Sequence, residues 1–454
     1  MPFVSLNPAT NQLIHTHASW DSGHLDSVLE KSGRAQQLWA QTSFASRAGM
    51  LRKAASQLLA QRDRFATLIT QEMGKPMREA RAEVEKCAAA CEYYALNGEE
   101  FLRTETIESD AAKSYVAYYP LGVVLAVMPW NFPFWQVFRA AAPALMAGNA
   151  VVLKHAPNVP QCALAMEEIF RDSGLPEGVF TNLMIEVEQV AGVIASPHVQ
   201  AVTLTGSEAA GRKVAACAGQ HLKKCVLELG GSDPFVVLHD ADMDLAVGAA
   251  VSSRFLNCGQ SCIAAKRFIL VPQIADEFLR RFKTAVDALK LGDPMLEDTQ
   301  IGPMARVDLR DTLHQQVADS IKQGAVAVTG CKPLGGDGFF YQPSILDHVT
   351  AQAPAWHEEL FGPVAIVIRA TDEDDALRLA NETRFGLGSS IWSRDTARAE
   401  QLASRIQAGC SFVNGMVKSD PRLPFGGIKS SGYGRELSRL GIREFVNAKT
   451  VWIR

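Results

Sequence analysis

A length of 454 residues predicts about three domains, and 47% apolar with 21% charged residues is typical of a folded globular protein rather than a disordered one. The net charge of −4, without a block of like charges, argues against an extended nucleic-acid surface. No apolar run approaches the roughly 18–20 residues that cross a bilayer, and the N-terminus lacks the features of a secretory signal. Nine cysteines without regular spacing favour reduced thiols, so we expect a cytoplasmic protein without membrane or nucleic-acid partners.

The first hundred residues are predicted to be helical. A capped helix is expected over 21–41, and apolar residues at a 3.6-residue period predict a second one over 46–73, before a Gly-Lys-Pro stop. A third helix is expected over 77–102. The two β-rich runs within 114–127, split by a proline, are compatible with an exposed hairpin or arm, or with core strands.

From there on, strands and helices alternate. The first region has expected strands at 123–128, 150–153, 179–183, 201–205 and 224–229, with helices at 134–146, 159–173, 186–195 and 208–218. The second begins with a strand at 235–238, a helix at 245–255, a strand at 267–271 and a helix at 274–289, then turn-rich segments to about 414 that include a candidate surface loop at 324–338. Such alternation predicts parallel sheets covered by helices, with ligands at the carboxyl ends of the strands.

Two turns after predicted strands have the composition of binding sites. Gly206 and Ser207 open a helix, where free N–H groups and the helix dipole favour a phosphate, although a turn with a simple cap has the same composition. Asn131 lies between two prolines, so its amide is suited to rigid presentation as an oxyanion donor. A rigid aromatic turn is the alternative for that segment.

Two further side chains have the chemistry of catalytic groups. Cys262 follows Cys258 in a polar, glycine-containing loop before a strand, as a reactive thiol would, and no metal is expected because no histidine pair or second Cys pair lies nearby. Glu228 ends an apolar strand, where burial would raise its pKa toward that of a useful base. A glutamate that points to solvent at the strand end is an equal alternative.

These segments occur in one order along the chain: PWNFP at 129–133, GNAVVLKHAP at 148–157, TGS at 205–207, LELGG at 227–231, GQSC at 259–262, EELFGPV at 358–364 and PFGGIKSSGYGRE at 424–436. Together they resemble the NAD(P)-dependent aldehyde dehydrogenase superfamily over essentially the whole chain. The resemblance implies an α/β fold with two doubly wound parallel-sheet domains and a small β oligomerisation arm. It assigns the cofactor-binding domain to 1–109 and 121–229, the catalytic domain to 230–420, and the arm and tail to 110–120 and 421–454.

The resemblance also implies roles for single residues. Cys262 is the nucleophile that forms a thiohemiacetal and then a thioester, and Asn131 with the backbone N–H of Cys262 forms the oxyanion hole. Glu228 activates the water that hydrolyses the thioester. The tail segment 445–453 has the composition of a strand that adds to a partner's sheet, so we expect a homodimer or homotetramer.

The cofactor residues implied by the resemblance surround one predicted dinucleotide site: Trp130, Lys154, His155, Ala156, Pro157, Gly206, Ser207, Leu229, Glu359 and Phe361. One departure concerns Pro157, where NAD-preferring members usually carry a glutamate that holds the adenosine ribose. Without that carboxylate nothing repels a 2′-phosphate beside Lys154. We expect NAD as the cofactor, with NADP possible.

The expected substrate is a small-molecule aldehyde that carries a carboxylate. Arg139 stands where succinate-semialdehyde dehydrogenases have an arginine, and Ser419 stands where they place a serine near the substrate carboxylate, whereas Leu256 replaces a second arginine of some members. An arginine paired with a protein acid is the alternative for Arg139. The resemblance thus implies oxidation of succinic semialdehyde, with broader semialdehyde or aliphatic specificity, or a catalytically silent scaffold, as alternatives.

Overall fold

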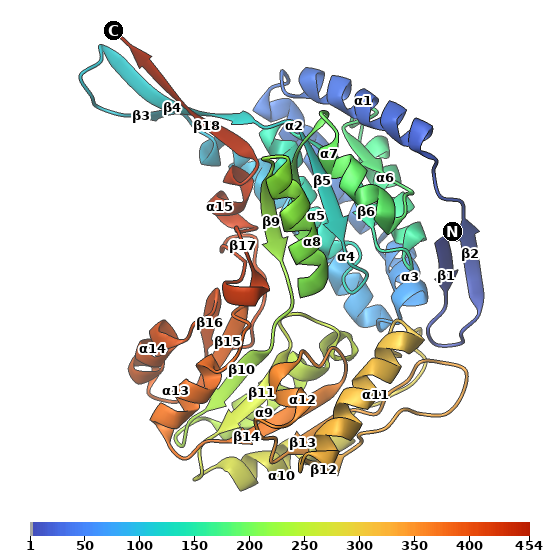
Figure 1. Ribbon diagram of the computed structural model, residues 1–454, viewed down its shortest axis with the longest axis vertical. Coiled ribbons are helices and arrows are strands. Elements are labelled where there is room, and N and C mark those ends of the chain that lie inside the picture. Colours follow the sequence, from blue (N-terminus) through green and yellow to red (C-terminus); the bar gives the residue numbers. More distant parts are fainter. Residues whose placement is uncertain (1–2) are drawn as a thin grey trace.

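The computed structural model describes residues 3–454 and contains two large sheets, each covered by helices on both faces, stacked as two lobes (Figure 1). A three-stranded sheet projects from the upper lobe, and a two-stranded hairpin lies at the N-terminal end. This arrangement confirms the predicted α/β class with two doubly wound sheets and a separate small β sheet.

The six-stranded sheet has the order β17-β9-β8-β5-β6-β7 and is parallel except for its edge strand β17. Its bounds are β5 (Val123–Met128), β6 (Ala150–His155), β7 (Phe180–Asn182), β8 (Val199–Thr205), β9 (Lys224–Glu228) and β17 (Gly432–Tyr433). The central strands are runs of buried β-branched and aliphatic residues, as expected of strands covered on both faces. The connecting elements are α5 (Trp135–Ala147), α6 (Pro160–Asp172), the 3-10 turn η1 (Val187–Gln189), α7 (Val190–Ala195) and α8 (Glu208–Gln220).

The N-terminal helices pack against this lobe and differ from expectation at one point. They are α1 (Ser22–Trp39), α2 (Phe44–Ala60), α3 (Arg62–Met73) and α4 (Met77–Phe101). The single helix predicted over 46–73 is wrong, because Gln61, with φ of −113° and ψ of 22°, leaves the helical conformation and separates α2 from α3. The break allows Leu58 and Phe65, on the two sides of it, both to be fully buried. The hairpin β1 (Phe3–Leu6) and β2 (Leu13–His17) was not predicted.

The seven-stranded sheet has the order β12-β13-β14-β11-β10-β15-β16, parallel except for β12. Its strands are β10 (Asp233–Val237), β11 (Ala265–Leu270), β12 (Val326–Thr329), β13 (Ser344–Asp347), β14 (Val364–Arg369), β15 (Gly388–Trp392) and β16 (Cys410–Val413). Its helices are α9 (Met243–Phe255), α10 (Ala275–Asp287), α11 (Val307–Lys322), α12 (Pro354–His357), α13 (Glu373–Asn381) and α14 (Thr396–Arg405). The predicted loop over 324–338 therefore contains an edge strand, which pairs with β13 through a run too short to stand out from its glycine-rich surroundings.

The projecting sheet has the order β18-β4-β3, from β3 (Glu105–Thr106), β4 (Lys113–Pro120) and β18 (Val446–Ile453). The two β-rich runs of 114–127 thus separate, since the first lies in the arm and the second is the core strand β5. The segment before β18 holds the 3-10 turn η3 (Lys429–Ser431), β17 and α15 (Ser438–Arg443), and β17 extends the six-stranded sheet beside β9. Within residues 3–454, no helix has the length and apolar character needed to span a bilayer.

Candidate active site

Eight of the ten predicted cofactor residues lie at the carboxyl ends of four neighbouring parallel strands, and Glu359 and Phe361 lie in the loop before β14 of the other sheet. Trp130 lies after β5, Lys154 is the last residue but one of β6, Gly206 follows β8 and Leu229 follows β9. These strands are adjacent in the order β9-β8-β5-β6, so four loops that are distant in sequence meet at one sheet edge. Parallel α/β sheets bind ligands at this edge.

The cysteine loop begins with an unusual backbone turn. After α9, the 3-10 turn η2 (Leu256–Gly259) has three successive residues in the left-handed region: Asn257, Cys258 and Gly259 have φ of 57°, 53° and 70°. A Cβ atom at Gly259 would lie 2.3 Å from the carbonyl oxygen of Gly362, so only glycine fits there. The Asn257 N–H donates to Oε2 of Glu79 at 2.7 Å, which ties this strained turn to α4.

The carbonyl of Gln260 joins Asn131 to the cysteine loop. It accepts a hydrogen bond from Nδ2 of Asn131 and another from Nδ2 of Asn257, each at 3.0 Å. The Asn257 amide also donates to the carbonyl of Asn131 at 2.7 Å. Since an amide nitrogen has two hydrogens, the Asn131 side chain keeps one N–H for a ligand while the other fixes its orientation.

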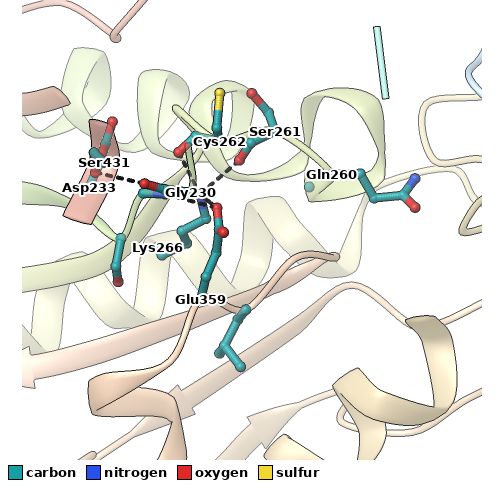
Figure 2. Close-up of polar contacts among 12 residues, drawn as sticks. Gly230, Asp233, Gln260, Ser261, Cys262, Lys266, Glu359 and Ser431 are labelled. Carbon is teal, nitrogen blue, oxygen red and sulfur yellow. Dashed lines mark hydrogen bonds and ion pairs between the residues drawn. The ribbon is translucent and has the colours of Figure 1, made fainter. Parts of the chain in front are cut away.

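Lys266 holds the backbone on either side of the predicted nucleophile. Its ammonium group donates to the carbonyls of Ser261 and Cys262, both at 2.7 Å, and forms an ion pair with Glu359 at 3.1 Å (Figure 2). The Cys262 residue is partly exposed, but its thiol is enclosed, and this burial raises the pKa of the thiol to about 12. The nearby charges of Arg139 and Lys266 act in the opposite direction, toward the thiolate.

Glu228 is buried, which excludes the solvent-facing alternative. The residue is 2% exposed, and neither of its carboxyl oxygens has a hydrogen-bond partner within residues 3–454. Burial, followed by the charge of Glu436, raises its pKa well above the usual range, whereas Arg139 lowers it. A Cβ atom at Gly426 would lie 2.6 Å from Oε1 of Glu228, so the glycine lets this loop approach the carboxyl group closely.

Cys262, Arg139 and Ser419 line one cavity of about 350 Å³. Arg139, on α5, is buried and forms an ion pair with Glu436, and its guanidinium lies 4.7 Å from the centre of the Phe425 ring. The pairing with a protein acid, which the sequence left open as the alternative, is therefore present, and a direct substrate contact of Arg139 stays a prediction. Among residues 3–454, no cluster of three or more metal-ligating side chains occurs.

The phosphate and nicotinamide ends of the predicted dinucleotide site have shapes that fit a cofactor. A Cβ atom at Gly206 would meet only one side-chain atom, at 3.6 Å, so the turn leaves room for a close backbone contact, and Ser207 caps α8. Glu359 accepts from the N–H of Gly231 at 3.1 Å. Trp130 and Phe361 pack edge to face with ring centres 5.8 Å apart, and the buried Leu229 contacts α8 at Gly211. Trp130 and Leu229 come from two loops, and Glu359 and Phe361 share a third.

The adenosine end has a buried cation. Lys154 donates to the carbonyl of His155 at 2.8 Å, and burial lowers its pKa to about 8. The ring of His155 bonds to the carbonyl of Pro133 and to the N–H of Ala156, at 2.9 and 2.8 Å, so the ring supports the loop from inside the protein. Burial lowers the pKa of His155 to about 4, which keeps the imidazole neutral. Pro157 is exposed beside them.

Sequence reasoning missed the residues that hold the predicted ones in place. Gln260 lies in the GQSC motif and Glu436 in the PFGGIKSSGYGRE motif, so the motifs could have indicated that both residues belong to the site. Lys266 lies four residues after Cys262 and has no local signature. Lys75 and Glu83, a buried ion pair, have none either. The Glu83 carboxylate also accepts from the N–H groups of Phe134 and Trp135, at the start of α5, at 2.9 and 3.0 Å.

Comparison with known proteins agrees with this geometry. The family model described as "Aldehyde dehydrogenase family" matches residues 2–451. The "Probable succinate-semialdehyde dehydrogenase [NADP(+)]" of Synechocystis sp. is 51% identical over 453 residues, all of both chains, and the "Succinate semialdehyde dehydrogenase [NAD(P)+] Sad" of Escherichia coli is 46% identical over 99% of this chain and 97% of its own. The solved succinic semialdehyde dehydrogenase from Streptococcus pyogenes, in complex with NADP+, has a TM-score of 0.98 at 38% identity, with 99% of both chains covered. The chain therefore belongs to the aldehyde dehydrogenase family and is an NAD(P)-dependent oxidoreductase.

The buried thiol generates a pH prediction. Because the pKa of Cys262 lies near 12 in the protein without cofactor, the rate of its alkylation by iodoacetamide should rise about tenfold for each pH unit from 7 to 9. Peptide mass spectrometry of the 262 site measures that rate, with Cys262→Ala as the blank. A rate that levels off below pH 9 would contradict the enclosed thiol.

Proposed function

We propose that this chain oxidises succinic semialdehyde to succinate, with Cys262 as nucleophile and an NAD(P) cofactor. The observation that carries the proposal is the cavity that places Cys262 together with Ser419 and the cation Lys86. A cationic, hydroxyl-bearing wall suits an aldehyde that ends in a carboxylate. The names of the full-length relatives support the same substrate.

The proposed reaction begins at the Cys262 thiolate. The sulfur forms a bond to the aldehyde carbon, and the aldehyde oxygen, as it gains negative charge, accepts the second N–H of Asn131 and the backbone N–H of Cys262. Bound NAD(P)+ supplies the acceptor for the hydride that leaves this carbon, and a thioester remains on Cys262. The role of Lys266 is to keep the carbonyls of Ser261 and Cys262 turned inward, so that the N–H side of the loop faces the substrate.

Glu228 is the proposed base for the second half of the reaction. Its carboxylate takes a proton from a water molecule, the water oxygen bonds to the thioester carbon, and the carbon–sulfur bond breaks to release the acid and the Cys262 thiolate, with the proton left on Glu228. A buried carboxyl with a raised pKa is a stronger base than an exposed one, and Arg139 limits the rise so that the ionised form stays accessible.

The substrate proposal is tested by the rate of NAD(P)H formation with aldehydes at equal concentration. We expect kcat/KM for succinic semialdehyde to exceed that for butanal, which has the same chain length without the carboxylate, by at least about 30-fold. Glutaric semialdehyde, one methylene longer, should lie between them. Equal kcat/KM for succinic semialdehyde and butanal would favour the broader aldehyde dehydrogenase, and no turnover with any aldehyde would favour the silent scaffold.

For the cofactor we propose a preference for NADP over NAD, which moves away from the NAD expected from the sequence. Within residues 3–454 no carboxylate forms an ion pair with Lys154, and position 157 carries the exposed Pro157. A 2′-phosphate would supply the missing negative charge for this buried ammonium. The NADP(+) in the name of the Synechocystis relative supports the same preference.

The preference has a direct kinetic test. We expect kcat/KM for NADP to exceed that for NAD by at least about tenfold, and Lys154→Met to lower kcat/KM for NADP by at least about 30-fold. The same variant should change kcat/KM for NAD by about threefold or less, because NAD brings no phosphate to this position. Initial rates at a fixed aldehyde concentration measure all four values, and a wild-type preference for NAD would overturn the proposal.

The projecting sheet supports a homo-oligomer, dimer or tetramer. Strand β18 is an edge strand, since its only partner within residues 3–454 is β4, and Trp452 and Ile453 near its end are about half exposed. An unpaired edge with exposed apolar residues is a surface that a second copy can cover. Light scattering on the purified protein should give two or four times the chain mass, and a single monomer mass would refute the oligomer. The nine free thiols fit the reducing cytoplasm expected from the sequence.

A further inference from the structure

Two loops of the site lead into neighbouring strands of the seven-stranded sheet. The nucleophile loop, residues 256–262, precedes β11, and the cofactor loop, residues 358–363, which carries Glu359 and Phe361, precedes β14. Strands β11 and β14 are adjacent and parallel, so the two loops lie at the same edge of the sheet. The contacts between these loops therefore decide how a bound cofactor lies relative to Cys262.

Arg254 holds carbonyl groups of both loops with one nitrogen atom. It lies in the last turn of α9 and is fully buried. Its Nη2 donates to the carbonyl of Gly259 at 3.2 Å, to that of Leu360 at 3.0 Å, and to that of Gly362. A Cβ atom at Gly259 would lie 2.8 Å from the same nitrogen, so the glycine lets the nucleophile loop come this close. Arg254 thus joins the end of α9 to both loops.

The guanidinium of Arg254 is held without an acid. Within residues 3–454 no carboxylate forms an ion pair with it, and its Nε and Nη1 are buried without a hydrogen-bond partner. Burial lowers the pKa of Arg254, and the charge of Glu359 acts in the opposite direction. A buried charge without a counter-ion is costly, and proteins keep such costly groups mainly at functional sites. The three carbonyl contacts are therefore the feature that a role for Arg254 has to explain.

Lys266 is a second link between the same two loops. Its ammonium group donates to the carbonyls of Ser261 and Cys262 in the nucleophile loop and pairs with Glu359 in the cofactor loop (Figure 2). An ammonium group has three hydrogens, so all of its donors are engaged. Lys266 contacts the nucleophile residue itself, whereas Arg254 forms hydrogen bonds only with Gly259 and the cofactor loop. Arg254 is therefore the link that can be weakened without removing a contact of the reacting groups.

We propose that Arg254 is a positioning residue for hydride transfer, because it fixes the cofactor loop against the nucleophile loop. This inference rests on the proposed function, in which Glu359 and Phe361 lie at the nicotinamide end of the cofactor, and it adds a residue that the proposed mechanism does not use. Hydride leaves the aldehyde carbon on Cys262 only when the acceptor carbon of the nicotinamide is aligned with it. A displacement of about 1 Å can lower such a rate by about 100-fold.

A reaction of Cys262 that needs no cofactor gives the internal reference. With p-nitrophenyl acetate, the Cys262 sulfur bonds to the acetyl carbon, p-nitrophenolate leaves, and water activated by Glu228 hydrolyses the resulting thioester. This reaction uses the nucleophile, the oxyanion donors and the base, but not the alignment of a cofactor. The ratio of hydride transfer to ester hydrolysis therefore reports on the position of the cofactor loop.

The central experiment measures both reactions in Arg254→Lys. The lysine keeps the charge, but its nitrogen lies nearer the backbone than Nη2 and does not reach the carbonyls of both loops. We expect the rate of the first NADPH turnover, measured after rapid mixing with NADP+ and succinic semialdehyde, to fall at least about tenfold. Hydrolysis of p-nitrophenyl acetate should change by about threefold or less, which also shows that the variant is folded.

Deuterium at the aldehyde carbon identifies the affected step. In Arg254→Lys hydride transfer should limit the first turnover, so this turnover should be slower with the deuterated aldehyde than with the ordinary one. A slowed first turnover that is insensitive to deuterium would overturn the proposal, because an earlier step would then be the one affected. An equal loss of both reactions of Cys262 would overturn it as well, in favour of general damage to the nucleophile loop.

Arg267 supplies a matched control. It is also fully buried and donates to three carbonyls, those of Ser232, Leu379 and Ala380, at 2.8, 2.9 and 2.9 Å, but it holds neither loop. We expect Arg267→Lys to lower the melting temperature, as Arg254→Lys does, and to change the ratio of hydride transfer to ester hydrolysis by about twofold or less. An equal change of this ratio in both variants would assign the effect to lost stability and overturn the proposal.

The wild type separates this inference from the function on which it rests. A wild type that forms no NAD(P)H from any aldehyde refutes the proposed function itself. A wild type that oxidises succinic semialdehyde, together with an unchanged first turnover in Arg254→Lys, refutes only the role of Arg254.

Discussion

The carbonyl oxygen of Gln260 is the point at which the two halves of the site meet. It belongs to the loop of Cys262, in the lobe of the seven-stranded sheet, and it accepts from Asn131, whose loop follows a strand of the six-stranded sheet. A second bond from Asn257 keeps this oxygen in place, and the Gln260 side chain reaches the N–H of Ala305 at 2.9 Å. The relative position of nucleophile and oxyanion donor therefore depends on this junction, not on either lobe alone.

Around that junction three cations are paired with acids. Lys266 is paired with Glu359, Arg139 with Glu436 and Lys75 with Glu83, and each pair joins segments that are distant in the chain or fixes a loop at the site. Buried pairs of this kind serve orientation, because desolvation offsets most of their attraction. The cavity is lined by the cations Arg78, Lys86, Arg139 and Lys418 and by the acids Glu79 and Glu83, and this excess of positive charge makes it complementary to an anion.

Most of the fold was predictable because its signals are local. The parallel strands are short buried runs of β-branched and aliphatic residues, and a turn or a cap such as Ser207 bounds each helix. The break at Gln61 was missed, since the apolar period continues through it on both sides. The strand β12 was missed as well, because its residues are partly exposed and its pairing with β13 depends on a distant segment.

For the site, the motifs located the reacting groups but not their partners. Cys262, Glu228 and Asn131 were found from residue type and position. The structure places Cys262 and Asn131 at one junction, and it buries Glu228 where the charges of Arg139 and Glu436 act on it. The pairing of Arg139 with Glu436 joins residues nearly 300 positions apart, so no local pattern signals it. Lys86 lies in an Ala- and Glu-rich helix, where a lysine is an ordinary solvent-facing residue, and only the packing of α4 against Trp135 and Ser419 distinguishes it.

The orientation of the substrate in the cavity decides whether Cys262 and Asn131 act on the aldehyde group. A crystal structure of the Cys262→Ala variant with NADP+ and succinic semialdehyde would show it directly. We predict the aldehyde carbon beside residue 262, its oxygen facing Nδ2 of Asn131, and the carboxylate in the part of the cavity lined by Ser419. An aldehyde group remote from residue 262 would contradict this orientation.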